Sequence, residues 1–89
     1  MIDLETYANK INIPIDELKS KSRKREIVTA RSVYWYYLWK RRFTYEEIAR
    51  IFNMNYSTVI YGVKKINDFI ELKDSYIERY LNVIEYKLK

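Results

Sequence analysis

The sequence has no cysteine and no histidine, and among its 89 residues it has a single glycine (Gly62) and a single proline (Pro14). Without thiol and imidazole groups, the chain cannot form disulfides, thiolate or imidazole metal sites, or a nucleophile–histidine pair. The missing cysteine also fits a reducing compartment. With a single glycine, the chain cannot form a glycine-rich phosphate loop. We therefore expect neither an enzyme nor a bound cofactor.

Long apolar runs are also missing, since no segment approaches the roughly 18 residues that would suggest a transmembrane helix. The start of the chain has no signal-peptide pattern. We expect a soluble, cytoplasmic protein without stable membrane insertion. The length suffices for one small domain whose core closes without disulfides or metals. Because glycine and proline are so scarce, the prediction is an all-α fold: a compact bundle of five to six helices in one domain, residues 1–89.

Positive charge is in excess, and its distribution is uneven. The net charge is +5, but between Lys19 and Arg42 nine basic residues accompany a single acidic one, Glu26. A basic block of this kind is typical of a surface that binds phosphates. Charge alone is also compatible with a solvated basic surface, or with attachment to acidic membranes. The basic block therefore indicates a function only in combination with a binding motif.

Such a motif lies between Phe43 and Ile66. Thr44 and Glu47 have the spacing of a capping box, and apolar residues then recur at helical spacing, which predicts a helix over residues 45–52. A short turn follows, and Asn55 or Ser57 caps a second helix over about 56–70. Two helices joined in this way form a helix-turn-helix, whose second helix offers its N-terminal side chains to the DNA major groove.

The remaining helices follow from caps and apolar stripes. Asp3 starts a helix that Asn12 ends, residues 16–19 form a brief helical turn, and a capping-box pattern at Ser75 and Glu78 predicts a last helix over about 76–87. The longest helix is predicted from about Lys24 to Arg41. Its apolar stripe should form the centre of the core: Ile27, Ala30, Val33, Tyr34, Tyr37 and Leu38.

Several aromatic residues of the long helix, Trp35, Tyr36 and Trp39, fall mainly off this stripe. They could cover the terminal helices, stack on nucleic acid, or form a surface for a partner. The last possibility gives a second functional hypothesis, a helical protein-interaction module or homodimer with an aromatic patch around Trp35 and Trp39. Gly62 is expected to let another helix approach the second motif helix closely.

Five segments carry a family resemblance: residues 18–23, 30–31, 47–52, 57–59 and 64–66. Through them the chain resembles the C-terminal DNA-binding domain of the bacterial replication initiator DnaA, in the Trp-repressor-like helix-turn-helix group. Ser57-Thr58-Val59 is the most specific piece, because the family typically has Asp-His-Thr-Thr-Val there. The resemblance implies double-stranded DNA binding in replication initiation or transcription control. It also implies that Arg31 enters the minor groove and that Ser57 and Thr58 contact the major groove and backbone.

The expected contacts divide into positioning and reading. The following residues should hold phosphates: Lys21, Arg23, Lys24, Arg25, Lys64 and Lys65, with the hydroxyls of Thr44 and Tyr45. On the second motif helix, Asn55 should pair with adenine, Tyr56 should form a hydrogen bond or lie against a thymine methyl, and Thr58 should reach a base or a phosphate. Tyr61 completes the predicted DNA-binding set.

Arg31, or an arginine of the basic loop, should favour a narrow A·T-rich minor groove. The family's glycine pair is replaced by the shorter Asn53-Met54, and its Asp-His pair by Asn55-Tyr56. We therefore expect an A·T-containing site that differs from the usual DnaA site. Alternatives remain for single residues: Asn55 as a cap only, Tyr56 packed over the turn, and Arg31 in a salt bridge on its own helix.

Overall fold

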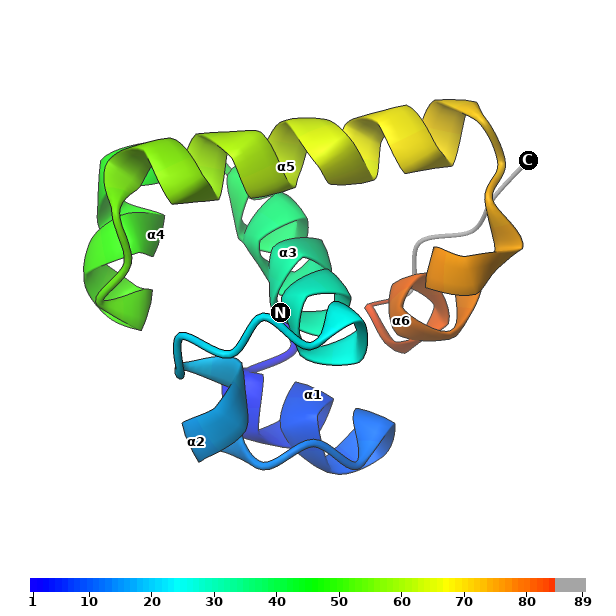
Figure 1. Ribbon diagram of the computed structural model, residues 1–89, viewed down its shortest axis with the longest axis horizontal. Coiled ribbons are helices and arrows are strands. Elements are labelled where there is room, and N and C mark those ends of the chain that lie inside the picture. Colours follow the sequence, from blue (N-terminus) through cyan, green and yellow to red (C-terminus); the bar gives the residue numbers. More distant parts are fainter. Residues whose placement is uncertain (85–89) are drawn as a thin grey trace.

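The computed structural model describes residues 1–84, and all regular structure in them is helical (Figure 1). The elements in chain order are α1 (Leu4–Ile11), α2 (Ile15–Leu18), α3 (Arg25–Lys40), α4 (Tyr45–Phe52), α5 (Tyr56–Glu71), the 3₁₀ helix η1 (Ser75–Ile77) and α6 (Glu78–Val83). The radius of gyration of the Cα atoms is 11.8 Å. The predicted all-α bundle is confirmed, and so are the two motif helices.

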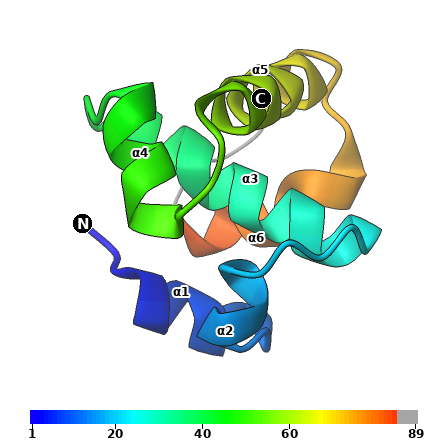
Figure 2. The same cartoon turned by 60° about the vertical axis from the view of Figure 1, so that its left-hand side comes forward.

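Helix α3 runs through the centre of the molecule, with α4 and α5 on one side and α1 and α2 on the other (Figure 2). Every residue from Thr29 to Leu38 is buried. The expectation that Trp35 and Tyr36 fall off the core stripe is wrong, since they are only 1% and 2% exposed. The reason is that α2, α4, α5 and α6 all pack on α3, so it has no solvent-facing side over this stretch.

Tyrosine hydroxyls attach the N-terminal segment to α3. The Tyr7 hydroxyl donates to the Ala30 carbonyl at 2.6 Å, and the Tyr34 hydroxyl donates to the Ile2 carbonyl at 2.9 Å. The Ile2 N–H donates in turn to the Tyr37 hydroxyl at 2.6 Å. The rings of Tyr7 and Tyr34 also contact each other, with centroids 5.1 Å apart. These aromatic side chains therefore fill the core while their polar ends find partners.

The N-terminal caps follow the sequence closely. The Asp3 carboxylate accepts from the Thr6 N–H at 2.8 Å, and this hydrogen bond lowers the pKa of Asp3. Asn12 ends α1 in the left-handed region with φ 60°, as predicted. The next helix begins one residue earlier than expected, at Ile15, because Pro14 occupies its N-cap position.

The start of the last helix is corrected by the structure. The Asp74 carboxylate accepts from the Tyr76 N–H at 2.9 Å, so Asp74 is the cap and a 3₁₀ turn precedes α6. The predicted capping box of Ser75 and Glu78 is wrong because an ionised acceptor is available one residue earlier. The three residues expected to face inward are buried: Ile77, Leu81 and Ile84. The predicted end near Lys87 lies outside the described residues.

Candidate nucleic-acid interface

The first motif helix, α4, is capped as the sequence predicts. The Thr44 hydroxyl oxygen accepts from the Glu47 N–H at 3.1 Å, and the Glu47 carboxylate accepts from the Thr44 N–H at 2.9 Å. The hydrogen bond from the Thr44 N–H to the carboxylate lowers the pKa of Glu47. Because an accepting hydroxyl can still donate its own hydrogen, Thr44 keeps a donor at this exposed helix start.

The motif turn lifts the start of α5 into solvent. Asn53 adopts the left-handed conformation with φ 51°, and the Asn55 side-chain oxygen accepts from the Ser57 N–H at 2.8 Å. Asn55, rather than Ser57, is therefore the N-cap of α5. The side chains of residues 55–58 are all exposed. The N-terminal turn of α5 thus presents an amide and three hydroxyl groups, which are the kinds of group that read base edges.

The loop before α3 contains the densest positive charge, and it lies beside this turn. The Lys21 ammonium group donates to the Asn53 carbonyl at 3.3 Å, which ties the loop to the C-terminal end of α4. Lys21, Arg23, Lys24 and Arg25 are all exposed. In Figure 1 this loop is drawn in cyan and lies below α4. The fold therefore brings the basic loop and the motif turn to neighbouring parts of one surface.

A contact in the minor groove needs an exposed side chain, whereas the side chain of Arg31 is buried. Its side chain is only 6% exposed, and its Nη1 donates to the Ser20 carbonyl at 2.9 Å. Burial lowers the pKa of its guanidinium group. The bond supports the basic loop, so the contact of Arg31 with DNA stays a prediction. Arg23, which belongs to the loop itself and is exposed, has the access that Arg31 lacks.

Further along α5, Tyr61 and Lys65 form a pair one helical turn apart. The Lys65 ammonium group donates to the Tyr61 hydroxyl at 3.2 Å and lies 5.4 Å from the ring centroid. Lys64 is also exposed. Because consecutive residues of a helix are separated by about 100°, Lys64 and Lys65 face different directions. Only Lys65 faces the N-terminal half of α3.

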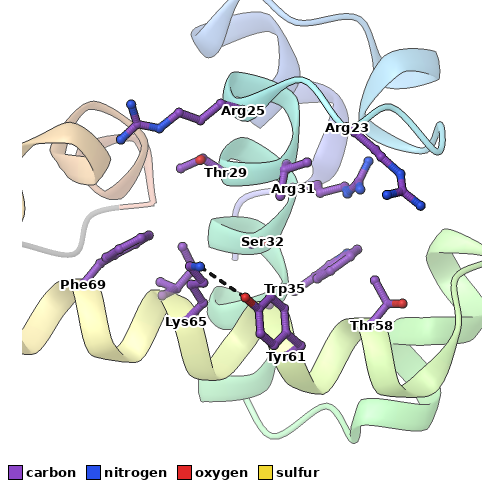
Figure 3. A pocket seen from close by; sticks show the side chains of 13 residues that line it. Arg23, Arg25, Thr29, Arg31, Ser32, Trp35, Thr58, Tyr61, Lys65 and Phe69 are labelled. Carbon is purple, nitrogen blue, oxygen red and sulfur yellow. Dashed lines mark hydrogen bonds between the residues drawn. The ribbon is translucent and has the colours of Figure 1, made fainter.

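A groove with a volume of about 410 Å³ lies between α3 and α5, and Figure 3 shows the side chains around it. Arg23 and Arg31 approach it from one side, and Thr58, Tyr61 and Lys65 line it from α5. This groove could not be predicted from the sequence, because its lining comes from α5 and from α3 with its preceding loop, which lie far apart in the chain. Six residues belong both to the groove and to the predicted DNA-binding set: Arg23, Arg25, Arg31, Thr58, Tyr61 and Lys65.

Three aromatic side chains contact one another in sequence next to the motif: Trp39, Tyr45 and Tyr56. The rings of Trp39 and Tyr45 are stacked, with centroids 6.1 Å apart, and Tyr45 meets Tyr56 edge to face at 6.3 Å. Tyr56 therefore packs against α4 and is still 47% exposed. The prediction of a surface patch that contains both Trp35 and Trp39 is wrong, because Trp35 is buried. Trp39 is partly exposed, at 37%.

Within residues 1–84 there is no group of three or more acidic side chains that could hold a metal ion. In the same part of the chain, no helix combines the length and the apolar character needed to cross a membrane. The chemistry that this surface offers is hydrogen bonding and positive charge.

Comparisons with known proteins agree with this geometry. The family profile described as "Bacterial dnaA protein helix-turn-helix" matches residues 4–66. The chromosomal replication initiator protein DnaA of Mycoplasma pneumoniae is 36% identical over 73 residues, which is 81% of this chain and 17% of that protein. DnaA of Campylobacter curvus is 39% identical over 71 residues, or 76% of this chain and 16% of that protein.

DnaA of Desulfotalea psychrophila is 32% identical over 83 residues, or 90% of this chain. The chain spans 17% of that relative's length as well, so the shared part is a small fraction of each full-length protein. No solved structure gives a significant match. The profile match ends at Ile66, which includes α4, the turn and most of α5.

Proposed function

The chain belongs to the family of bacterial DnaA helix-turn-helix domains, and from this we propose that it binds double-stranded DNA with sequence specificity. The observation that carries the proposal is the hydrogen bond from Lys21 to Asn53, because it holds the basic loop next to the exposed start of α5. One surface then offers both phosphate-binding charge and base-reading side chains. We place this activity in replication initiation, the process named for its relatives, with transcription control as an alternative setting.

Positioning is the task of the exposed basic residues. The proposed phosphate contacts are Lys21, Arg23, Lys24, Arg25, Lys64 and Lys65, assisted by the hydroxyl groups of Thr44 and Tyr45. Their side chains are exposed, except that Tyr45 is half-buried. Because each neutralised phosphate releases counterions, about six such contacts should make the logarithm of affinity fall against the logarithm of salt concentration with a slope of about −5.

Reading is the task of the N-terminal turn of α5. The Asn55 oxygen accepts one hydrogen bond from Ser57 and has a second lone pair, so the amide can still pair with an adenine edge. Tyr56 presents its ring to a thymine methyl, and Thr58 reaches a base or a phosphate. Arg23, or Arg31 after leaving its site, would enter a narrow minor groove and favour A·T pairs there.

The test is selection of bound duplexes from a random pool at two salt concentrations, followed by titration of the best duplex over a salt series. We expect an enriched A·T-containing site. Lys24→Gln should weaken binding and make the salt slope less steep by about one unit. Lys10→Gln is the matched control and should change neither, because Lys10 is an exposed residue of α1 outside the proposed surface. Equal affinity for the selected and the base-scrambled duplex would refute sequence specificity.

A further inference from the structure

The groove between α3 and α5 has the size and the charge of a binding site for a small molecule. Its volume of about 410 Å³ lies in the range of ligand pockets. Three arginines (Arg23, Arg25 and Arg31) and Lys65 line it, whereas no carboxylate within residues 1–84 does so. Arg25 already packs over the Tyr76 ring at 3.9 Å. The other charges leave the groove with an excess of positive potential, which favours an anion.

Two buried donors on the lining side chains have no hydrogen-bond partner among the described residues. They are Nε of Arg31 and Nε1 of the Trp35 indole. Both groups can only donate, so an acceptor on a ligand, or water, must satisfy them. A buried donor without a partner costs free energy, and such exceptions in a folded protein call for an explanation. Both atoms belong to side chains that line one groove, which is the second observation that points to an acceptor-bearing ligand.

The other walls of the groove are apolar or aromatic. Trp35 and Ile66 are buried there, and Val28 and Phe69 are half-buried. Figure 3 shows Phe69, Trp35 and Tyr61 around the same space as the cationic groups. An anionic group alone would gain no binding energy from such walls. An anionic group attached to a flat apolar body would gain it, because that body packs against the walls. The lining therefore matches both halves of an aromatic organic anion.

We propose that this groove binds a small aromatic organic anion, of the class of aryl phosphates and nucleoside monophosphates. The anionic group lies among the cationic side chains that line the groove, and the ring packs against the half-buried Val28 and Phe69, next to the buried Trp35. The proposed DNA surface shares Arg23, Thr58 and Lys65 with the groove, so a bound anion competes with DNA phosphates for the same charges. This competition rests on the proposed function, whereas binding in the groove does not.

The chain offers a built-in reporter, because it has only two tryptophans. Trp35 lines the groove, and Trp39 lies outside it, beside Tyr45 and Tyr56. We would titrate isotope-labelled protein with naphthyl phosphate and follow the two indole N–H signals by NMR. The expected result is a saturable shift of the Trp35 signal at submillimolar ligand, without a shift of the Trp39 signal. Trp39→Phe assigns the signals.

Matched probes separate the two halves of the ligand. Neutral naphthalene methanol and inorganic phosphate should each bind at least tenfold more weakly than naphthyl phosphate. Lys65→Gln should weaken naphthyl phosphate roughly fivefold, as the loss of one partly exposed ion pair would. Lys64→Gln, the adjacent and equally charged position outside the groove, should leave its affinity unchanged. Both lysines are exposed, so neither change removes core packing.

Three outcomes overturn the inference: an unmoved Trp35 signal at millimolar ligand, equal shifts of both indole signals, or equal affinity for the charged and the neutral probe. The competition is measured separately, as the rise in apparent Kd for the selected duplex when naphthyl phosphate is added. If the groove binds the probe but no duplex is bound, the proposed function fails and the groove remains. If duplexes bind and the Trp35 signal stays fixed, the groove fails alone.

Discussion

Asn55 shows how one side chain in this molecule is held for two tasks. Its oxygen caps α5 through the Ser57 N–H at 2.8 Å, and its exposed amide group is free to donate. A cap needs only an acceptor, whereas bidentate pairing with adenine needs a donor and an acceptor together. Aspartate is as good a cap as asparagine, but it cannot donate. A change to aspartate therefore separates the structural task from the recognition task.

For Asn55→Asp we expect an unchanged fold and a change of one preferred base from adenine toward cytosine, whose amino group donates to a carboxylate. About 1–3 kcal/mol of discrimination should be involved. The measurement is selection of duplexes with the variant and the original protein side by side, with circular dichroism to check the helices. If both proteins select the same site, Asn55 is a cap and takes no part in reading.

At the scale of elements, the close contact between α3 and α5 depends on the single glycine. A Cβ added at Gly62 would lie 2.8 Å from Trp35 Cε3 and 2.9 Å from Ser32 Oγ. The expected close approach of a second helix is therefore present, and the neighbour is α3. Because the Trp35 ring is 1% exposed and enclosed by other core residues, it has little room to move away.

Gly62→Ala brings two effects of opposite sign into competition. Alanine favours a helix over glycine by about 1 kcal/mol, but overpacking of a tight core costs about 1–3 kcal/mol. With contacts this short against a rigid ring, overpacking should win, and the free energy of unfolding should fall. Urea denaturation measures it, with Asn67→Ala on the exposed side of α5 as a control for helix propensity. A variant that is more stable than the original protein would contradict the tight contact.

Local signals explain which elements were predictable. Helix caps act on backbone groups within three or four residues, as at Asp3, at Thr44 with Glu47, and at Asn53. The positions of α1, α4 and the start of α5 were therefore predicted correctly. Competition between neighbouring acceptors is harder to foresee, as Asp74 shows at the start of η1. Contacts between distant segments were not predictable: the hydrogen bond from Arg31 to Ser20 joins α3 to the loop before it, and the groove exists only because α3 packs on α5.

At the scale of the whole molecule, the positive charge of the basic loop gathers beside the motif. The acidic N-terminal segment forms α1 and α2, which Figure 1 places on the side of α3 opposite to α5. The basic loop and the start of α5 lie together through the bond between Lys21 and Asn53. If the proposed function holds, this concentration of positive charge raises the rate of productive encounter with a polyanion at low salt.

Two buried tyrosines, Tyr34 on α3 and Tyr7 on α1, make the stability of the whole molecule sensitive to alkali. Burial raises the pKa of Tyr34 to about 12, and burial raises the pKa of Tyr7 well above its ordinary value of 10.0. Both groups stay neutral in the folded state over a range in which they ionise in the unfolded chain. Their stabilising contribution is therefore complete below pH 10 and is lost as the pH rises toward and through the folded-state pKa. The free energy of unfolding, measured by urea denaturation, should fall steadily over this range. Tyr34→Phe and Tyr7→Phe should each make the fall less steep, since each removes one titrating group while lysine deprotonation affects all variants alike. An equally steep fall in both variants would show that these hydroxyl groups are not held neutral by the core.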